Sequence, residues 1–194
     1  IIVGVKRNIG TPFADTPDEG TLMVNTEFSP IASPDFEAGP PSEDAVELSR
    51  VVDRGIRESH SIELDKLVIT PGEKVWTVFV DIHIINHDGN LLDAAALAAI
   101  AALHNTQVPK IDGDKVLRGE YAGKLPVVFK PITISVCKIG KDFVLDPVLE
   151  EEGVVDAKLA VAVRDDDKVC ALQKQGTKAF EFGDLEKIID IAIE

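Results

Sequence analysis

An alternating apolar segment, followed directly by an alanine-rich segment, limits the folds open to this chain. In residues 74–86 every second side chain is large and apolar, which is the period of a strand that buries one face. These residues are Trp76, Val78, Val80, Ile82 and Ile84. The turn Asp88-Gly89-Asn90 leads into a helix over 91–104, where many alanines require close packing against a sheet or another helix. Together the two segments predict layers of strands and helices.

The rest of the chain alternates between strand and helix patterns, without repeats, low-complexity tracts or an interdomain linker. A helix capped by Ser42 is expected to run to about His60, and a terminal helix to span 183–192. Residues 29–42 contain four prolines and form an irregular loop whose length favours a functional role. Further strands are expected at 1–6, 20–28, 66–70, 131–138, 142–145, 156–164 and 168–175. We therefore predict a single α/β or α+β domain over residues 1–194.

The net charge of −14 argues against a dedicated nucleic-acid-binding domain. Phosphates would be repelled across most of the surface of such an acidic protein. Any RNA contact must then come from a local basic patch, or from a surface shared with a more basic partner. The chain also contains no apolar run approaching the ~20 residues that a membrane helix needs, and its first residues do not resemble a signal peptide. Because it lacks an initiator Met, we expect a further N-terminal segment in the native chain.

Cysteine and histidine give no sign of a metal site or a redox centre. Cys137 and Cys170 lie in strand-like segments without CxxC spacing, which favours two buried thiols in a reducing cytosol over a disulfide. The four histidines form no pairing typical of a structural metal site. The acidic run 150–152 is expected to be a solvated turn, and the run 165–167 the tip of a hairpin.

Three arginines share one face of the helix expected after Ser42. Arg50, Arg54 and Arg57 are spaced i, i+4, i+7, which places them within a narrow arc. The opposite arc should face the core, with Ala45, Leu48, Val52 and Ile56. A guanidinium can donate two hydrogen bonds to one phosphate, so the face could be a ladder of phosphate contacts. Alternatively, Glu47 and Asp53 could pair with these arginines and leave a solvated, salt-bridged face.

The segment 47–57, with the sequence ELSRVVDRGIR, resembles a helix of the RNase PH-type phosphorolytic exoribonucleases. The segments 19–25, 29–34, 39–41, 51–59 and 88–95 are similar to archaeal exosome subunits of this family. The resemblance runs the length of the chain. It implies the RNase PH fold, of the ribosomal protein S5 domain 2-like type, with mixed sheets packed against two internal helices and a C-terminal helix.

The family contains both catalytic and non-catalytic subunits, and the phosphate pocket distinguishes them. Phosphorolysis needs a pocket for inorganic phosphate and a carboxylate near the reacting oxygens or a metal. Catalytic members hold phosphate with the Thr and Arg of a D-G-G-T-R-T-A motif at the start of a helix. The resemblance places Leu91 and Leu92 at these two positions, followed by the anion Asp93. Apolar side chains cannot bind phosphate, and a carboxylate would repel it.

The position of the catalytic acid departs from the family pattern as well. The resemblance places Lys158 where catalytic members carry an acid, and Val148 where they carry another Asp. A cation cannot serve as a carboxylate base or a metal ligand. Asp156 or Asp146 could supply one acid if the alignment shifts. An active phosphorolytic 3′–5′ exoribonuclease therefore stays open as the alternative.

The resemblance implies a non-catalytic subunit of the archaeal exosome, a phosphate-dependent 3′–5′ exoribonuclease that degrades RNA. Such a subunit has no catalytic residues, metal or cofactor of its own. The implied partners are a catalytic RNase PH-like sister subunit, RNA-binding cap proteins and single-stranded RNA, but no membrane. With the sister subunit, the chain would form a cytoplasmic hexameric ring of three heterodimers. The implied RNA-binding residues are Arg50, Arg54 and Arg57, and Arg57 could instead hold the interface. A structural scaffold without RNA contact is a third interpretation.

Overall fold

The alternating strand lies at the centre of the first sheet. The computed structural model describes residues 1–113 and 115–194, except for the side chain of Arg118. Strand β4 (Lys74–Ile84) pairs antiparallel with β1 (Ile2–Gly10) on one side and parallel with β2 (Thr21–Phe28) on the other. The short strand β3 (Val68–Thr70) also pairs with β4. All five alternating apolar side chains of β4 are buried, which confirms the expected period.

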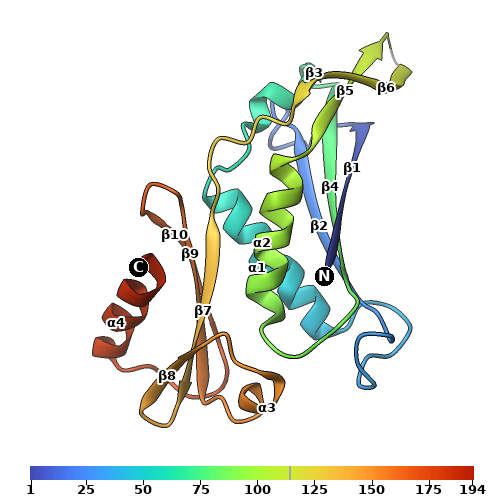
Figure 1. Cartoon of the computed structure of the whole chain (residues 1–194). Coiled ribbons are helices and arrows are strands. Elements are labelled where there is room, and N and C mark those ends of the chain that lie inside the picture. Colours follow the sequence, from blue (N-terminus) through green and yellow to red (C-terminus); the bar gives the residue numbers. More distant parts are fainter. Residues whose placement is uncertain (114) are drawn as a thin grey trace.

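A second, antiparallel sheet has the strand order β10-β9-β7-β8. Its strands are β7 (Ile132–Ile139), β8 (Asp142–Leu145), β9 (Ala157–Val163) and β10 (Val169–Gln175). Strands β5 (Gln107–Asp112) and β6 (Lys115–Lys124) form a separate hairpin, which projects away from both sheets (Figure 1).

Two helices lie between the sheets, and a third covers the outer face of the second sheet (Figure 1). Helix α1 (Glu43–Glu58) contacts β2 and β10, whereas α2 (Leu91–His104) contacts β1, β4 and β7. The alanines of α2 that face inward, Ala95, Ala96 and Ala99, are buried, so the helix packs closely as expected. The C-terminal helix α4 (Phe182–Ile193) packs on β7 and β9. This arrangement confirms the predicted mixed sheets with two internal helices and a C-terminal helix.

Most expected elements are found, with three differences. Ser42 caps α1 as predicted, because its side chain accepts a hydrogen bond from the backbone N–H of Ala45. The hairpin β5–β6 was not expected. Residues 64–67, the last two of which were expected to begin a strand, form the 3-10 helix η1 (Leu64–Leu67). Residues 149–152 form the one-turn helix α3 (Leu149–Glu152). None of the described helices is both long and apolar enough to cross a membrane.

Candidate functional site

The three arginines of α1 line one groove, as their spacing predicts. The groove has a volume of about 840 Å³ and runs along α1 between Val24 of β2 and Gln173 of β10. Arg50 is exposed and makes no hydrogen bond or ion pair with the described part of the chain. Arg54 is also exposed and donates one hydrogen bond to Oε1 of Gln173, at 3.0 Å. These two guanidiniums keep most of their donors available to a ligand.

Arg57 is bound within the protein. It forms an ion pair with Asp53 at 2.8 Å and donates to the backbone carbonyl of Leu22 at 3.1 Å. The hydrogen bond to Asp53 raises the pKa of Arg57 above its ordinary value. The expected Asp53 pair is therefore confirmed, whereas no Glu47–Arg50 pair forms within the described residues. The arginine face divides into Arg50, which has no partner in the described residues, Arg54, which contacts only Gln173 there, and Arg57, which joins α1 to β2.

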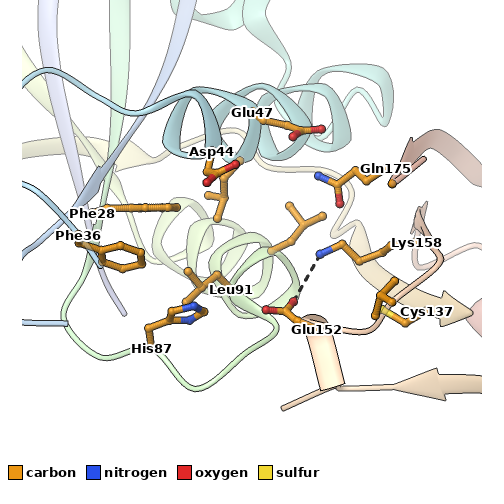
Figure 2. Close-up of a pocket in the computed structure, with 14 residues that line it drawn as sticks. Phe28, Phe36, Asp44, Glu47, His87, Leu91, Cys137, Glu152, Lys158 and Gln175 are labelled. Carbon is orange, nitrogen blue, oxygen red and sulfur yellow. Dashed lines mark ion pairs between the residues drawn. The ribbon is translucent and has the colours of Figure 1, made fainter. Parts of the chain in front are cut away.

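A second pocket, of about 370 Å³, lies on the other side of the first turns of α1. It is bordered by α1, the start of α2, and the ends of β2, β9 and β10 (Figure 2). Leu91 and Leu92 line this pocket, and so does Lys158. Three of the residues at which the sequence departs from the catalytic pattern are thus brought together, whereas Val148 and Asp93 do not line the pocket.

The start of α2 is occupied by a carboxylate of the protein itself. Asn90, the N-cap residue, has a left-handed backbone, and its N–H donates to Oε1 of Glu152 at 3.3 Å. The same Oε1 lies 3.6 Å from Nζ of Lys158 (Figure 2). A helix start favours an anion because its first N–H groups lack partners within the helix. Glu152 therefore stands where a bound phosphate would be stabilised, and the solvated turn expected at 150–152 is wrong for this residue.

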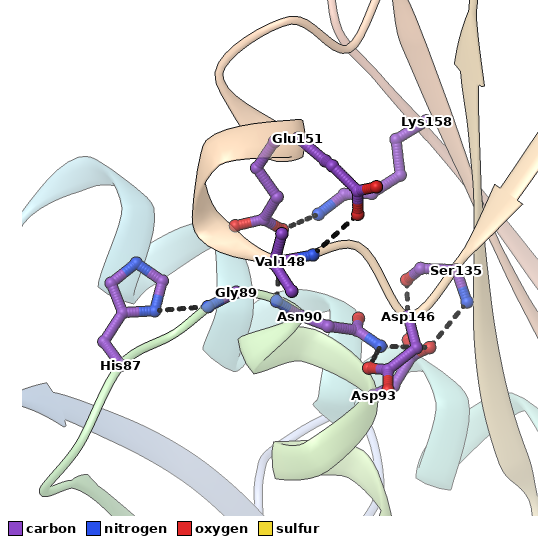
Figure 3. A network of polar contacts seen from close by, with 10 residues as sticks. His87, Gly89, Asn90, Asp93, Ser135, Asp146, Val148, Glu151 and Lys158 are labelled. Atoms are coloured by element: carbon purple, nitrogen blue, oxygen red, sulfur yellow. Dashed lines mark hydrogen bonds and ion pairs between the residues drawn. The ribbon is translucent and has the colours of Figure 1, made fainter.

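Asp93, in the first turn of α2, is turned toward β7 and away from the pocket. Its carboxylate accepts hydrogen bonds from the backbone N–H of Ser135 at 2.9 Å, from the Ser135 hydroxyl at 2.6 Å, and from Nδ2 of Asn90 at 3.1 Å (Figure 3). Burial raises the pKa of this carboxyl above its ordinary value, and the hydrogen bonds from Ser135 and Asn90 oppose that shift. Asp93 thus joins α2 to the second sheet.

The two aspartates that could have supplied a catalytic acid do not line the pocket. Asp146 accepts a hydrogen bond from Nδ2 of Asn90 at 2.9 Å. Asp156 accepts from Nζ of Lys178 at 2.6 Å and from the backbone N–H of Gly140 at 2.9 Å. The Lys178 contact is the main reason why the pKa of Asp156 is lowered. Both carboxylates are therefore engaged in contacts outside the pocket.

Sequence patterns did not indicate the aromatic wall of this pocket. Phe36, in the irregular loop 29–42, stacks on His87 with ring centroids 5.4 Å apart, and Phe28 lies against Phe36 at 4.6 Å. All three line the pocket (Figure 2). The only signal for Phe36 was the unusual length of its loop, because the contact joins residues about fifty positions apart.

The remaining titratable groups form no further site in the described residues. No cluster of three or more His, Cys, Asp or Glu side chains that could hold a metal is found there. Cys137 and Cys170 are free thiols, as expected, but Cys170 is only half-buried. Cys137 is buried in β7, and this burial raises the pKa of its thiol to about 11. Asp166, at the expected hairpin tip, pairs with Arg164 and Lys168.

Comparison with known proteins relates this geometry to one family. The model described as "3' exoribonuclease family, domain 1" matches residues 1–109, and the model described as "3' exoribonuclease family, domain 2" matches residues 131–194. The exosome complex component Rrp42 of Methanothermobacter thermautotrophicus is 50% identical over 197 residues, covering 100% of this chain and 73% of the relative. The protein of the same name from Archaeoglobus fulgidus is 49% identical over 193 residues, with coverages of 100% and 73%.

Two solved structures are similar to the whole fold. A chain of the Archaeoglobus fulgidus exosome with RNA bound to the active site has a TM-score of 0.91 at 50% identity, covering 98% of this chain and 74% of that one. A chain of an archaeal exosome core has a TM-score of 0.85 at 45% identity, with coverages of 98% and 71%.

Proposed function

Because the chain belongs to the 3′ exoribonuclease family of RNase PH-like proteins, we propose that it is a non-catalytic subunit of an archaeal exosome. In this role it completes the active site of a catalytic sister subunit and helps to guide single-stranded RNA toward it. Two similarities support the assembly: the relatives are named exosome components, and one similar structure is an exosome with RNA in its active site.

The main support for a loss of catalysis is the carboxylate that occupies the start of α2. Catalytic members hold phosphate there, whereas here Leu91 and Leu92 present apolar side chains and Glu152 supplies a carboxylate. A phosphate that entered would meet like charge at the one place where the helix favours an anion. Lys158 replaces the expected acid and pairs with Glu152, so it cannot act as a base. The pocket therefore lacks the phosphate ligands of the family motif and the acid at the family's catalytic position.

The groove along α1 supports RNA contact. Arg50 and Arg54 stand exposed in an otherwise acidic chain, and neither is committed to a carboxylate in the described residues. Such guanidiniums can bind the phosphates of a single strand without regard to sequence. We assign Arg57 to holding α1 against β2, at the edge of the same groove, because its Nε and Nη2 already donate to Asp53 and to the carbonyl of Leu22.

The proposed assembly is a cytoplasmic hexameric ring of three heterodimers, and RNA-binding cap proteins bind to this ring. A ring explains how an acidic chain could act on RNA. The arginine groove would face the RNA path beside a more basic sister subunit, and the acidic remainder would face solvent.

Mixing the subunits tests the proposal. The purified full-length protein, the purified sister subunit and their reconstituted complex are each incubated with poly(A) and inorganic phosphate. We expect nucleoside diphosphates from the complex and none from this protein alone. Phosphorolysis by this protein alone would contradict the proposal and favour an active exoribonuclease. A complex with Arg50→Glu and Arg54→Glu should bind RNA more weakly at moderate salt, and unchanged affinity would favour a scaffold without RNA contact.

A further inference from the structure

We infer that Gln173 of β10 is a positioning residue for RNA binding, which holds the guanidinium of Arg54 in place and leaves its positive charge available to a phosphate. This inference rests on the proposed RNA contact of Arg54. It goes beyond that contact because it assigns a part in RNA binding to a neutral side chain of the second sheet.

Gln173 lines the arginine groove from β10 and is half-buried. Its Oε1 accepts a hydrogen bond from Nη1 of Arg54 at 3.0 Å, an ordinary length for an N–H···O bond. The two residues are 119 positions apart, so the contact depends on the packing of α1 against β10. Gln173 pairs with Ala160 of β9, which fixes its backbone within the second sheet. A side chain on such a strand can hold another group more precisely than one on a loop.

The two contacts of the Gln173 amide agree on its orientation. Nε2 of Gln173 donates to the backbone carbonyl of Lys174 at 3.4 Å. A carbonyl oxygen accepts and cannot donate, so the amide nitrogen belongs on that side and Oε1 belongs on the side of Arg54. A reversed amide would place its N–H groups against the N–H groups of the guanidinium. The amide is therefore oriented to accept a hydrogen bond from Arg54.

A neutral partner distinguishes Arg54 from Arg57. Asp53 holds Arg57 through an ion pair at 2.8 Å, and its negative charge opposes the attraction of Arg57 for a phosphate. Gln173 carries no charge, so it can order Arg54 without weakening the attraction for an anion. In the described residues, Nε and Nη2 of Arg54 form no hydrogen bond. They can donate the two parallel hydrogen bonds that a phosphate accepts from a guanidinium.

Holding Arg54 before RNA arrives should raise the affinity for RNA. A long side chain that becomes ordered on binding loses rotamer freedom, and this loss opposes binding. Arg50, without a partner in the described residues, bears this loss in full. For Arg54, the hydrogen bond to Gln173 removes part of it. Without this bond, RNA should bind more weakly, although the number of positive charges in the groove is unchanged.

Filter binding of poly(A) to the reconstituted complex, over a range of salt concentrations, tests the inference. Gln173→Met removes the acceptor at similar side-chain length, and should lower affinity roughly two- to tenfold with an unchanged salt slope. Gln173→Glu keeps an acceptor but pairs Arg54 with a negative charge, so the slope should fall by ~0.7, as on loss of one phosphate contact. The matched control is Gln175→Met, on the same face of β10 but outside the groove. It should leave both quantities unchanged.

Combining Gln173→Met with Arg54→Ala separates this inference from the proposed function. If Gln173 acts through Arg54, Gln173→Met should weaken RNA binding only where Arg54 is present. An equal loss in both backgrounds, or no loss in either, would overturn the positioning role and leave the RNA contact of Arg54 intact. Unchanged affinity on Arg54→Ala alone would overturn that contact and the inference with it.

Discussion

Arg50 and Arg57 lie on the same face of α1, but their surroundings differ. Arg50 has no partner in the described residues, so its removal should leave the free energy of unfolding within about 0.5 kcal/mol of the wild type. In the complex, Arg50→Ala should lower RNA affinity. It should also reduce the salt dependence of binding by ~0.7 in slope, because one RNA phosphate is then no longer neutralised. Filter binding over a range of salt concentrations measures both quantities.

Arg57→Ala, in contrast, should lower the stability of the protein more than its RNA affinity. It removes the ion pair with Asp53 and leaves the carbonyl of Leu22 without this donor, which should cost about 1–2 kcal/mol of stability. Denaturant unfolding measures this change. A stable Arg57→Ala protein with a steep drop in RNA affinity would show that Arg57 contacts RNA instead of holding β2.

Gly89 is required by the close approach of two chain segments. A Cβ at this residue would lie 2.2 Å from the backbone oxygen of Pro147. The φ angle of +102° is also one that residues other than glycine rarely adopt. Gly72 has a φ angle of +73° but open space around it. Gly72→Ala should therefore cost only the backbone strain, about 1–2 kcal/mol, and Gly89→Ala about 3 kcal/mol or more. Equal losses in thermal unfolding would contradict the clash.

At the scale of the elements, one ion pair joins α4 to the second sheet. Lys138 of β7 pairs with Asp184 of α4, and both side chains are largely buried. The hydrogen bond from Lys138 lowers the pKa of Asp184 below its ordinary value of 3.8. The folded state then binds this proton less readily than the unfolded state. The pair's contribution to stability is present above that ordinary value, and is lost as the pH falls through the lower pKa of the folded state.

Lys138→Met should therefore flatten the acid limb of the stability curve. We expect the melting temperature of the variant to fall less between pH 5 and pH 2 than that of the wild type. The two curves should differ most near neutral pH and converge in acid. The exposed change Lys141→Met, on the neighbouring turn, is the control. A constant gap between wild type and Lys138→Met at every pH would show that the pair contributes through packing alone.

Local patterns predicted the elements that have strong local signals. The Ser42 cap, the alternation in β4 and the alanine content of α2 each act within a few residues, and each was found as expected. The hairpin β5–β6 was missed because Pro109 in β5 and glycines in β6 weaken a strand pattern. The role of Glu152 was missed because it depends on a contact with Asn90, which lies 62 residues away in sequence.

The candidate site, too, was predicted only in part from the sequence. The arginine face follows from helical spacing, and Leu91, Leu92 and Lys158 were found through a resemblance to a family motif. Neither spacing nor motif shows that these three residues share a pocket with Phe36 and His87. That grouping is set by how the loop 29–42 and the two sheets pack.

Across the whole molecule, contacts of α1 and α2 with the second sheet favour one folding unit over residues 1–194. A Cβ at Gly55 of α1 would lie 3.6 Å from Cβ of Ala162 in β9, so helix and sheet pack at contact distance. Arg54 reaches Gln173, and Asp93 reaches Ser135. We expect a single calorimetric transition with equal calorimetric and van't Hoff enthalpies. Two separate transitions would show that the regions matching the two family models unfold independently.

We propose that this chain cannot bind the phosphate that phosphorolysis consumes. Equilibrium dialysis with radiolabelled inorganic phosphate tests it, on the full-length protein alone and on the reconstituted complex. The proposal predicts no saturable binding by the protein alone and one phosphate for each pair of subunits in the complex. Saturable binding by the protein alone, or two phosphates for each pair, would contradict it.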